Sequence, residues 1–145
     1  MYRHILIPTD GSPLSDTAVK QGVALARSLN ARVTGLTVSP PFHTFALDPM
    51  MVSDIPETYK ADCNARAETD LGVVTSAAKA AGVPCAVEHV LADRPYEAII
   101  DTAKNKGCDL VFMASHGRKG MSAVILGSET VKVLTHSKTP VLVCR

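Results

Sequence analysis

Residues 113–131, MASHGRKGMSAVILGSETV, have the residue types of a site that could bind phosphate groups. The stretch follows an apolar run, contains three glycines and has no carboxylate before Glu129. Glycine reaches backbone angles that other residues avoid and lets a ligand approach the main chain closely, which indicates this role for Gly117. His116, Arg118 and Lys119 add positive charge beside it. The pattern therefore predicts a pocket for a polyanion.

The last glycine of this stretch, Gly127, precedes a short predicted helix whose first turn is Ser128, Glu129 and Thr130. Free N–H groups at the start of a helix carry partial positive charge, so an anion fits there. The hydroxyls of Ser128 and Thr130 can add donors. The glycines match neither the P-loop pattern nor the Rossmann fingerprint. On spacing alone, a loop with ordinary turns and a Gly-Ser helix cap explains the stretch equally well.

Asp10 follows the first predicted strand, in the turn Pro8-Thr9-Asp10-Gly11. Its carboxylate could accept hydrogen bonds from ribose hydroxyls or approach a metal bound to phosphate. The alternative is a turn-forming Asp in an Asp-Gly pair. In open α/β sheets, ligands lie beyond the carboxyl ends of the strands where the strand order reverses. Strands one and four are expected to be neighbours across that crevice, which favours a functional Asp10.

The elements that must position these residues alternate between strand-like and helix-like patterns. This alternation predicts one open, parallel, five-stranded sheet with helices on both faces and right-handed crossovers. The strands are expected at 4–9, 31–38, 84–91, 109–115 and 139–145, and the helices at 14–29, 57–81, 94–106 and 129–137.

Local residues mark several of these boundaries. Ser12 is a cap for the first helix, with Pro13 at its first position, and Asn30 is its stop. Asp93 is expected to cap the third helix. The strand at 84–91 has mixed polarity, which is typical of a sheet edge. Residues 39–57 form the one long irregular loop, which is either a functional lid or partner surface, or a variable surface insertion.

Composition limits the classes of protein that fit. The 145 residues suit one domain spanning 1–145, and 46% hydrophobic with 4% aromatic content predicts an aliphatic core. A net charge of +1 provides no general attraction to nucleic acid or to a membrane surface, so neither partner is expected. No apolar run is long enough to span a membrane, and a cytoplasmic location is expected. The four scattered cysteines predict reduced thiols in or near the core, although Cys144, next to the C-terminus, could be exposed.

Several spaced segments together resemble the universal stress protein (UspA) superfamily. They are ILIPTDGS near the start, ADRPYEAIIDTAKNKGCDLVFMASHGRKG, and the closing GSETVKVLTHSKTPVLVCR. The resemblance covers nearly the whole chain, and only the proline-rich loop contains no residues that are diagnostic of the family. It implies a Rossmann-like fold of the adenine nucleotide alpha hydrolase type. It also implies homodimerisation through the last strand, because pairing would cover an exposed apolar edge.

The resemblance further implies specific ligand contacts. The nucleotide-binding branch has a glycine, two residues, a second glycine, nine residues, and then Gly-Ser or Gly-Thr. Gly117 and Gly127-Ser128 match that pattern, while Ala114 replaces the first glycine. Pro8, Thr9 and Asp10 would line the adenosine side, the Val38 backbone would contact the adenine edge, and Met113 would lie beside the base. Ser128, Glu129 and Thr130 follow the phosphate turn.

The function that this favours is an ATP-binding regulator or sensor in the stress response, with Mg²⁺ accompanying ATP. No catalytic residue is assigned, since the sequence shows no nucleophile arrangement, metal-ligand cluster or paired carboxylates, and at most slow ATP hydrolysis is expected. One alternative is a dimeric interaction module of the same fold that binds no nucleotide. Another is a small redox or flavin carrier, which the position of the glycine loop and the few aromatic residues disfavour.

Overall fold

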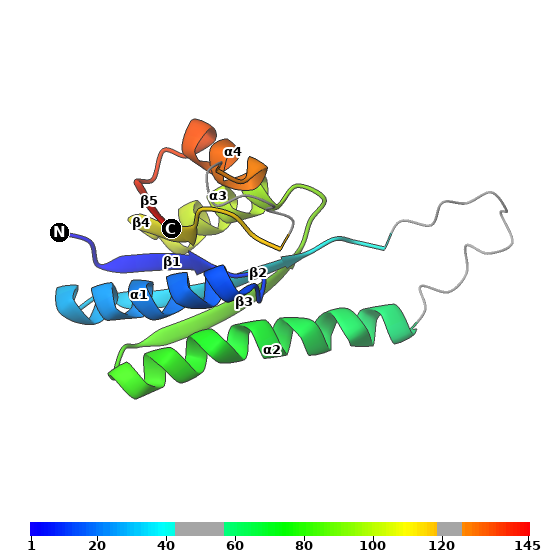
Figure 1. The fold of residues 1–145 in the computed structure, drawn as a ribbon, viewed down its shortest axis with the longest axis horizontal. Helices are drawn as coiled ribbons and strands as arrows, with labels where there is room; N and C mark the ends of the chain where they lie inside the picture. The colour runs from blue at the N-terminus through cyan, green and yellow to red at the C-terminus, as the bar shows by residue number, and fades with distance from the viewer. Residues whose placement is uncertain (43–56, 119–125) are drawn as a thin grey trace, which may run out of the picture.

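Five parallel strands form one sheet in the order β3-β2-β1-β4-β5 (Figure 1). The computed structural model describes residues 1–42, 57–118 and 126–145. Its strands are β1 (His4–Pro8), β2 (Arg32–Ser39), β3 (Cys85–Leu91), β4 (Leu110–Ala114) and β5 (Val141–Cys144). Its helices are α1 (Pro13–Leu29), α2 (Glu57–Ala81), α3 (Pro95–Lys106) and α4 (Ser128–His136). The predicted doubly wound sheet is confirmed.

The helices divide between the two faces of the sheet. One core cluster joins Ile5, Ile7 and Phe112 to residues of α1 and α2, and a second joins Leu6, Val111 and Met113 to α3 and α4. Three consecutive β1 residues, Ile5 to Ile7, have 0% exposure because helices cover both faces of the central strand. An unbroken apolar run is therefore what this strand requires.

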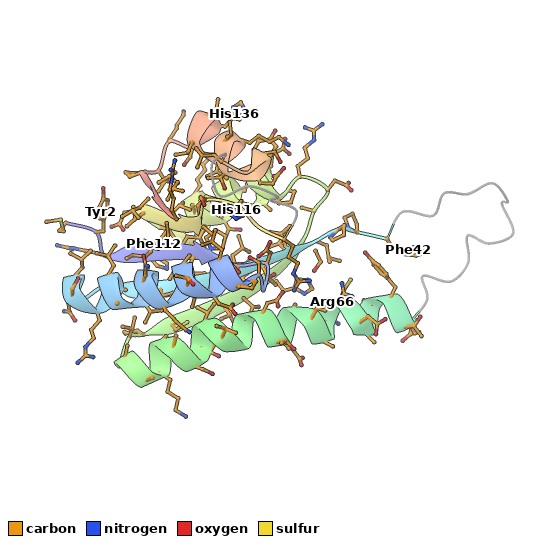
Figure 2. All side chains as sticks on the ribbon, in the orientation of Figure 1. Tyr2, Phe42, Arg66, Phe112, His116 and His136 are labelled. Carbon is orange, nitrogen blue, oxygen red and sulfur yellow. The ribbon has the colours of Figure 1, made fainter. Side chains whose placement is uncertain are left out.

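Small residues let the helices on the α1 side approach the sheet closely. A Cβ added at Gly35 of β2 would lie 2.9 Å from the Val74 Cγ1 of α2. A Cβ at Gly22 of α1 would lie 3.1 Å from the ring of Phe112, which is labelled in Figure 2. Larger side chains at these two positions would push α1 and α2 off the sheet.

The ends of α1 follow the predicted caps, whereas the start of α3 does not. Ser12 Oγ accepts a hydrogen bond from the Ser15 N–H, and Asn30 adopts a left-handed φ of 53° at the other end. The N-cap of α3 is Arg94 and not Asp93, and the Arg94 side chain makes no capping hydrogen bond. Glu129 Oε2 of α4 accepts from the Tyr96 N–H at 2.9 Å instead. The cap thus comes from a distant segment.

Cys144 is only 5% exposed and belongs to the core cluster under α1, which agrees with the prediction of thiols in or near the core and not with the exposed alternative. Its Sγ lies 3.2 Å from Gln21 Oε1 of α1. Strand β3 is an edge strand, as its mixed polarity predicted. Over the described ranges, no helix has the length and apolar character needed to cross a membrane.

His4, the first residue of β1, is a buried titratable residue. Its Nε2 lies 2.7 Å from Thr34 Oγ1, while its buried Nδ1 has no hydrogen-bond partner in the described structure. Burial, followed by the positive charge of Arg32, lowers the pKa of His4, although Asp109 acts in the opposite direction. The folded protein therefore disfavours protonated His4.

We expect acidification to destabilise the fold through His4. Because the unfolded chain takes up this proton more readily, the free energy of unfolding should fall as the pH drops below about 6.5. Urea unfolding between pH 7.5 and 5 measures this slope, and His4→Asn should flatten it. The exposed His136→Asn is the control and should leave the slope as in wild type. Equal slopes for wild type and His4→Asn would contradict the assignment.

Candidate functional site

The segments that follow β1 and β4 meet at one edge of the sheet. The two strands pair in parallel, with Ile5 opposite Leu110. Beyond their carboxyl ends, the Arg118 N–H donates a hydrogen bond to Asp10 Oδ2 at 2.8 Å. Residues 108 positions apart in the chain are therefore joined at the predicted crevice.

Asp10 is held as a carboxylate by main-chain donors. Its Oδ1 accepts from the Ser12 N–H at 3.0 Å, and its Oδ2 accepts from Arg118. Burial acts to raise the pKa of Asp10, but the hydrogen bonds from Ser12, Arg118 and Ser15 outweigh burial and leave the pKa below its ordinary value. An ionised carboxylate has lone pairs beyond those used here, so it can also accept hydrogen bonds from hydroxyl groups.

The structure corrects the reason for a glycine at position 117. Positive φ angles in the described chain occur at Gly11, Gly82, Gly107 and Asn30, and not at Gly117. A Cβ at Gly117 would instead overlap the Asp10 carboxylate. Glycine is needed here because the Asp10 side chain approaches the backbone, and that approach allows the hydrogen bond to Arg118.

Asp70 of α2 is a site residue that the sequence analysis missed. Its side chain is 14% exposed, and its Oδ1 lies 3.7 Å from Arg118 Nη2. Gly11, which has a φ of 72°, lies directly against this pair. A Cβ at Gly11 would overlap the Asp70 carboxylate and lie 2.7 Å from Arg118 Nη2. The sequence held one indication of its role: Asp70 is an acid on the stripe that buries Ala67 and Val74.

The start of α4 is fixed against the turn after β4. The Gly127 N–H donates to the Ser115 carbonyl at 2.8 Å, and a Cβ at Gly127 would lie 3.1 Å from both Cα and Cβ of His116. Gly127 is the N-cap residue and provides no side-chain capping bond. Within the described residues, the N-cap position thus leaves the first N–H groups of α4, beginning at Ser128, without a side-chain cap, an arrangement that suits an anion.

Three predicted site residues have side chains engaged within the protein. The Thr130 hydroxyl donates to the Ala114 carbonyl at 3.1 Å and is not the free donor that was expected. The Glu129 carboxylate accepts from the Tyr96 N–H and from Lys132 Nζ. Thr9 Oγ1 lies 3.0 Å from Ser15 Oγ, so it also helps to hold the turn.

The remaining predicted residues surround this edge at different depths. Pro8 ends β1, paired with Leu36. Val38 and Met113 share the core cluster on the α3 and α4 side, with Val38 half-buried and Met113 only 6% exposed. His116 is half-buried, with Nδ1 3.1 Å from Ser115 Oγ. Lys119 lies outside the described residues, as do residues 43–56 of the proline-rich loop.

Two further features limit the chemistry. Among the described residues, no group of three His, Cys, Asp or Glu side chains is arranged to hold a metal ion. A groove of about 430 Å³ lies between β3 and α3, lined in part by Glu88, Arg94 and Asp101, and it includes none of the residues above. The predicted chemistry thus depends on the main-chain donors and charges beyond β1 and β4, and not on this groove.

The fold and the crevice define an α/β protein of the doubly wound class, with its candidate site at a strand-order reversal. The sequence model of the universal stress protein family matches residues 1–145, and the chain belongs to this family. A universal stress protein from Methanocaldococcus jannaschii, MJ0531, is 30% identical over all of this chain and 83% of its own length. One from Thermus aquaticus is 28% identical over the whole of both chains.

Solved structures agree with this assignment. The structure of MJ0577, reported as a structure-based assignment of biochemical function, has a TM-score of 0.82 at 27% identity and covers 99% of this chain and 95% of its own. A universal stress protein solved in complex with cAMP has a TM-score of 0.69 at 27% identity, covering 99% and 97%. The fold is therefore shared along the entire chain.

We expect Gly117→Ala to weaken the fold at this edge. The added methyl must displace the Asp10 carboxylate and break its bond to the Arg118 N–H, at a cost of about 1–2 kcal/mol in the free energy of unfolding. Gly72→Ala on α2 is the control, because a Cβ there meets no atom within 4 Å. Urea titrations of both variants measure the difference. Equal stability of the two variants would show that Asp10 adapts without loss.

Proposed function

We propose that this protein binds ATP with Mg²⁺ at the carboxyl ends of β1 and β4 and acts as a nucleotide-dependent regulator or sensor in the cytoplasmic stress response. The observation that carries the proposal is the bond from the Arg118 N–H to Asp10, which joins the turn after β1 to the segment after β4, where His116 lies against Gly127 at the start of α4. A carboxylate suits ribose hydroxyls, and free helix N–H groups suit phosphate oxygens.

The adenosine half of the ligand is assigned to the β1 side of the crevice. Pro8, Thr9 and Asp10 would line it, with the Val38 backbone at the adenine edge and Met113 beside the base. In support, Val38 and Met113 lie in one core cluster. A universal stress protein of the same fold has been solved with cAMP, which contains adenosine.

The phosphate half is assigned to the β4 side. Gly117, Arg118, Lys119 and the segment Gly127 to Thr130 would face the phosphate oxygens. Mg²⁺ would bridge phosphate oxygens and take few ligands from the protein, which is common for this ion.

Ala114, which replaces the first glycine of the family motif, is compatible with binding. It is 8% exposed and belongs to the core cluster under α1, with Ile7 and Phe112. The extra methyl group is thus packed in the core and does not occupy the space beside α4. This observation favours nucleotide binding over the alternative of an interaction module without nucleotide.

The same proposal includes a homodimer formed through β5. This strand is an edge of the sheet, and its Leu142 is 40% exposed. On the neighbouring α4, Val131 is 45% and Leu134 is 42% exposed. An edge strand with adjacent exposed apolar side chains is the kind of surface that a second copy covers.

Calorimetric titration with ATP and Mg²⁺ tests nucleotide binding. Wild type should bind, and Gly127→Val should lose affinity by at least about tenfold, because its side chain would press on His116 and displace the phosphate turn. Gly72→Val places the same side chain at an open position on α2 and should bind as wild type. Wild type that ignores millimolar ATP would instead support the interaction module.

Light scattering during gel filtration tests the dimer. Leu142→Arg should convert a dimer to a monomer, because a charge would be buried at the centre of the paired edge. Leu91→Arg is the matched control, since Leu91 is 56% exposed on β3, the opposite edge of the sheet. A monomeric wild type would exclude the dimer. Loss of the dimer in Leu91→Arg but not in Leu142→Arg would place the interface away from β5.

A further inference from the structure

We propose that Asp70 makes nucleotide affinity depend on the number of phosphate charges, because it is the counter-ion that a phosphate group must displace from Arg118. This inference rests on the proposed nucleotide site and identifies the residue that selects among its ligands. Asp70 would thus act as a specificity-determining residue from α2, an element outside both glycine-containing segments.

The geometry of the pair allows exchange of partners. Arg118 Nη2 and Asp70 Oδ1 are 3.7 Å apart, a distance beyond that of a strong charge-assisted hydrogen bond. The Arg118 side chain is 52% exposed, so it can turn toward a ligand at the sheet edge. Asp70 is 14% exposed and lies on the buried stripe of α2, so it cannot follow. Phosphate binding therefore leaves Asp70 without its nearest cation.

The surrounding charges make this separation costly. Asp10 and Asp16 are like charges near Asp70, and Arg118 and Arg66 are its opposing charges. Burial comes first among the causes that raise the pKa of Asp70, and Arg118 does not fully offset it. Arg66 is labelled on α2 in Figure 2, one helical turn before Asp70. An incoming polyanion would add negative charge to a region where Asp70 already experiences the charges of Asp10 and Asp16.

Gly11 fixes where this competition takes place. Its missing side chain makes room for both the Asp70 carboxylate and the Arg118 guanidinium above the turn after β1. Asp10, one residue earlier, is the proposed ribose contact. The repulsion from Asp70 is consequently felt at the boundary between nucleoside and phosphates. An uncharged adenosine would avoid it, AMP would meet part of it, and ATP without Mg²⁺ would meet most of it.

The test compares adenosine, AMP and ATP without Mg²⁺ by calorimetry at low salt, for wild type and Asp70→Asn. Relative to wild type, Asp70→Asn should bind ATP about fivefold more tightly and AMP more tightly by a smaller factor. Its affinity for adenosine should be unchanged. Asp62→Asn is the matched control, because it removes one carboxylate from an exposed position on the same helix. Asp70→Glu restores the charge and should return ATP affinity toward that of wild type.

The outcomes separate this inference from the proposed function. If all variants bind adenosine and ATP and Asp70→Asn leaves their affinity ratio unchanged, Asp70 does not select the ligand, while the nucleotide site stands. If Asp62→Asn changes the ratio of ATP to adenosine affinity as much as Asp70→Asn does, the effect comes from net charge alone and the inference is overturned. If neither wild type nor Asp70→Asn binds any of the three ligands, the inference fails, and if wild type also ignores ATP with Mg²⁺, the proposed function fails with it. Thermal unfolding of Asp70→Asn verifies its fold, and Asp70→Ser replaces it if needed.

Discussion

The hydrogen bond from the Arg118 N–H to Asp10 Oδ2 is the contact on which the candidate site depends. It joins the turn after the central strand β1 to the turn after β4, and these two segments are 108 positions apart in the chain. A charged acceptor on a main-chain donor is among the stronger hydrogen bonds available to a protein. It forms only because Gly117 leaves space for the carboxylate, so the backbone and the side chain depend on each other.

This contact also explains how an almost neutral protein could bind a polyanion. No overall field attracts the ligand, since the net charge is +1. Donors are instead gathered at one edge by the parallel sheet, which ends β1 and β4 side by side and places the uncapped start of α4 beside them. Carboxylates lie among these donors. In the proposed site, the balance between these donors and carboxylates would set affinity and selectivity, so single acidic residues at this edge would matter more than total charge.

Much of the fold could be predicted because its determinants are local. Continuous apolar strands, a Ser12 cap and a left-handed stop at Asn30 are each determined within a few residues of the chain. The errors concern contacts between distant segments. The N-cap of α3 is Arg94 and not Asp93, Glu129 of α4 accepts from the Tyr96 N–H at the start of α3, and Asp70 reaches the site from α2. The sequence indicated a role for glycine at position 117, but the space that the Asp10 carboxylate takes there is visible only in the folded structure.

The carboxylate of Glu129 links α4 to α3, two helices on the same face of the sheet that β4 separates in the chain. It belongs to the first turn of α4, beside the candidate phosphate turn, and it satisfies the first turn of α3 through the Tyr96 N–H. Tyr96 in turn contacts the His136 ring, with centroids 5.6 Å apart, at the far end of α4. A displacement of α4 would thus strip α3 of its acceptor and separate the two rings. A shift at the sheet edge would thus also be felt at the outer surface of this helix pair.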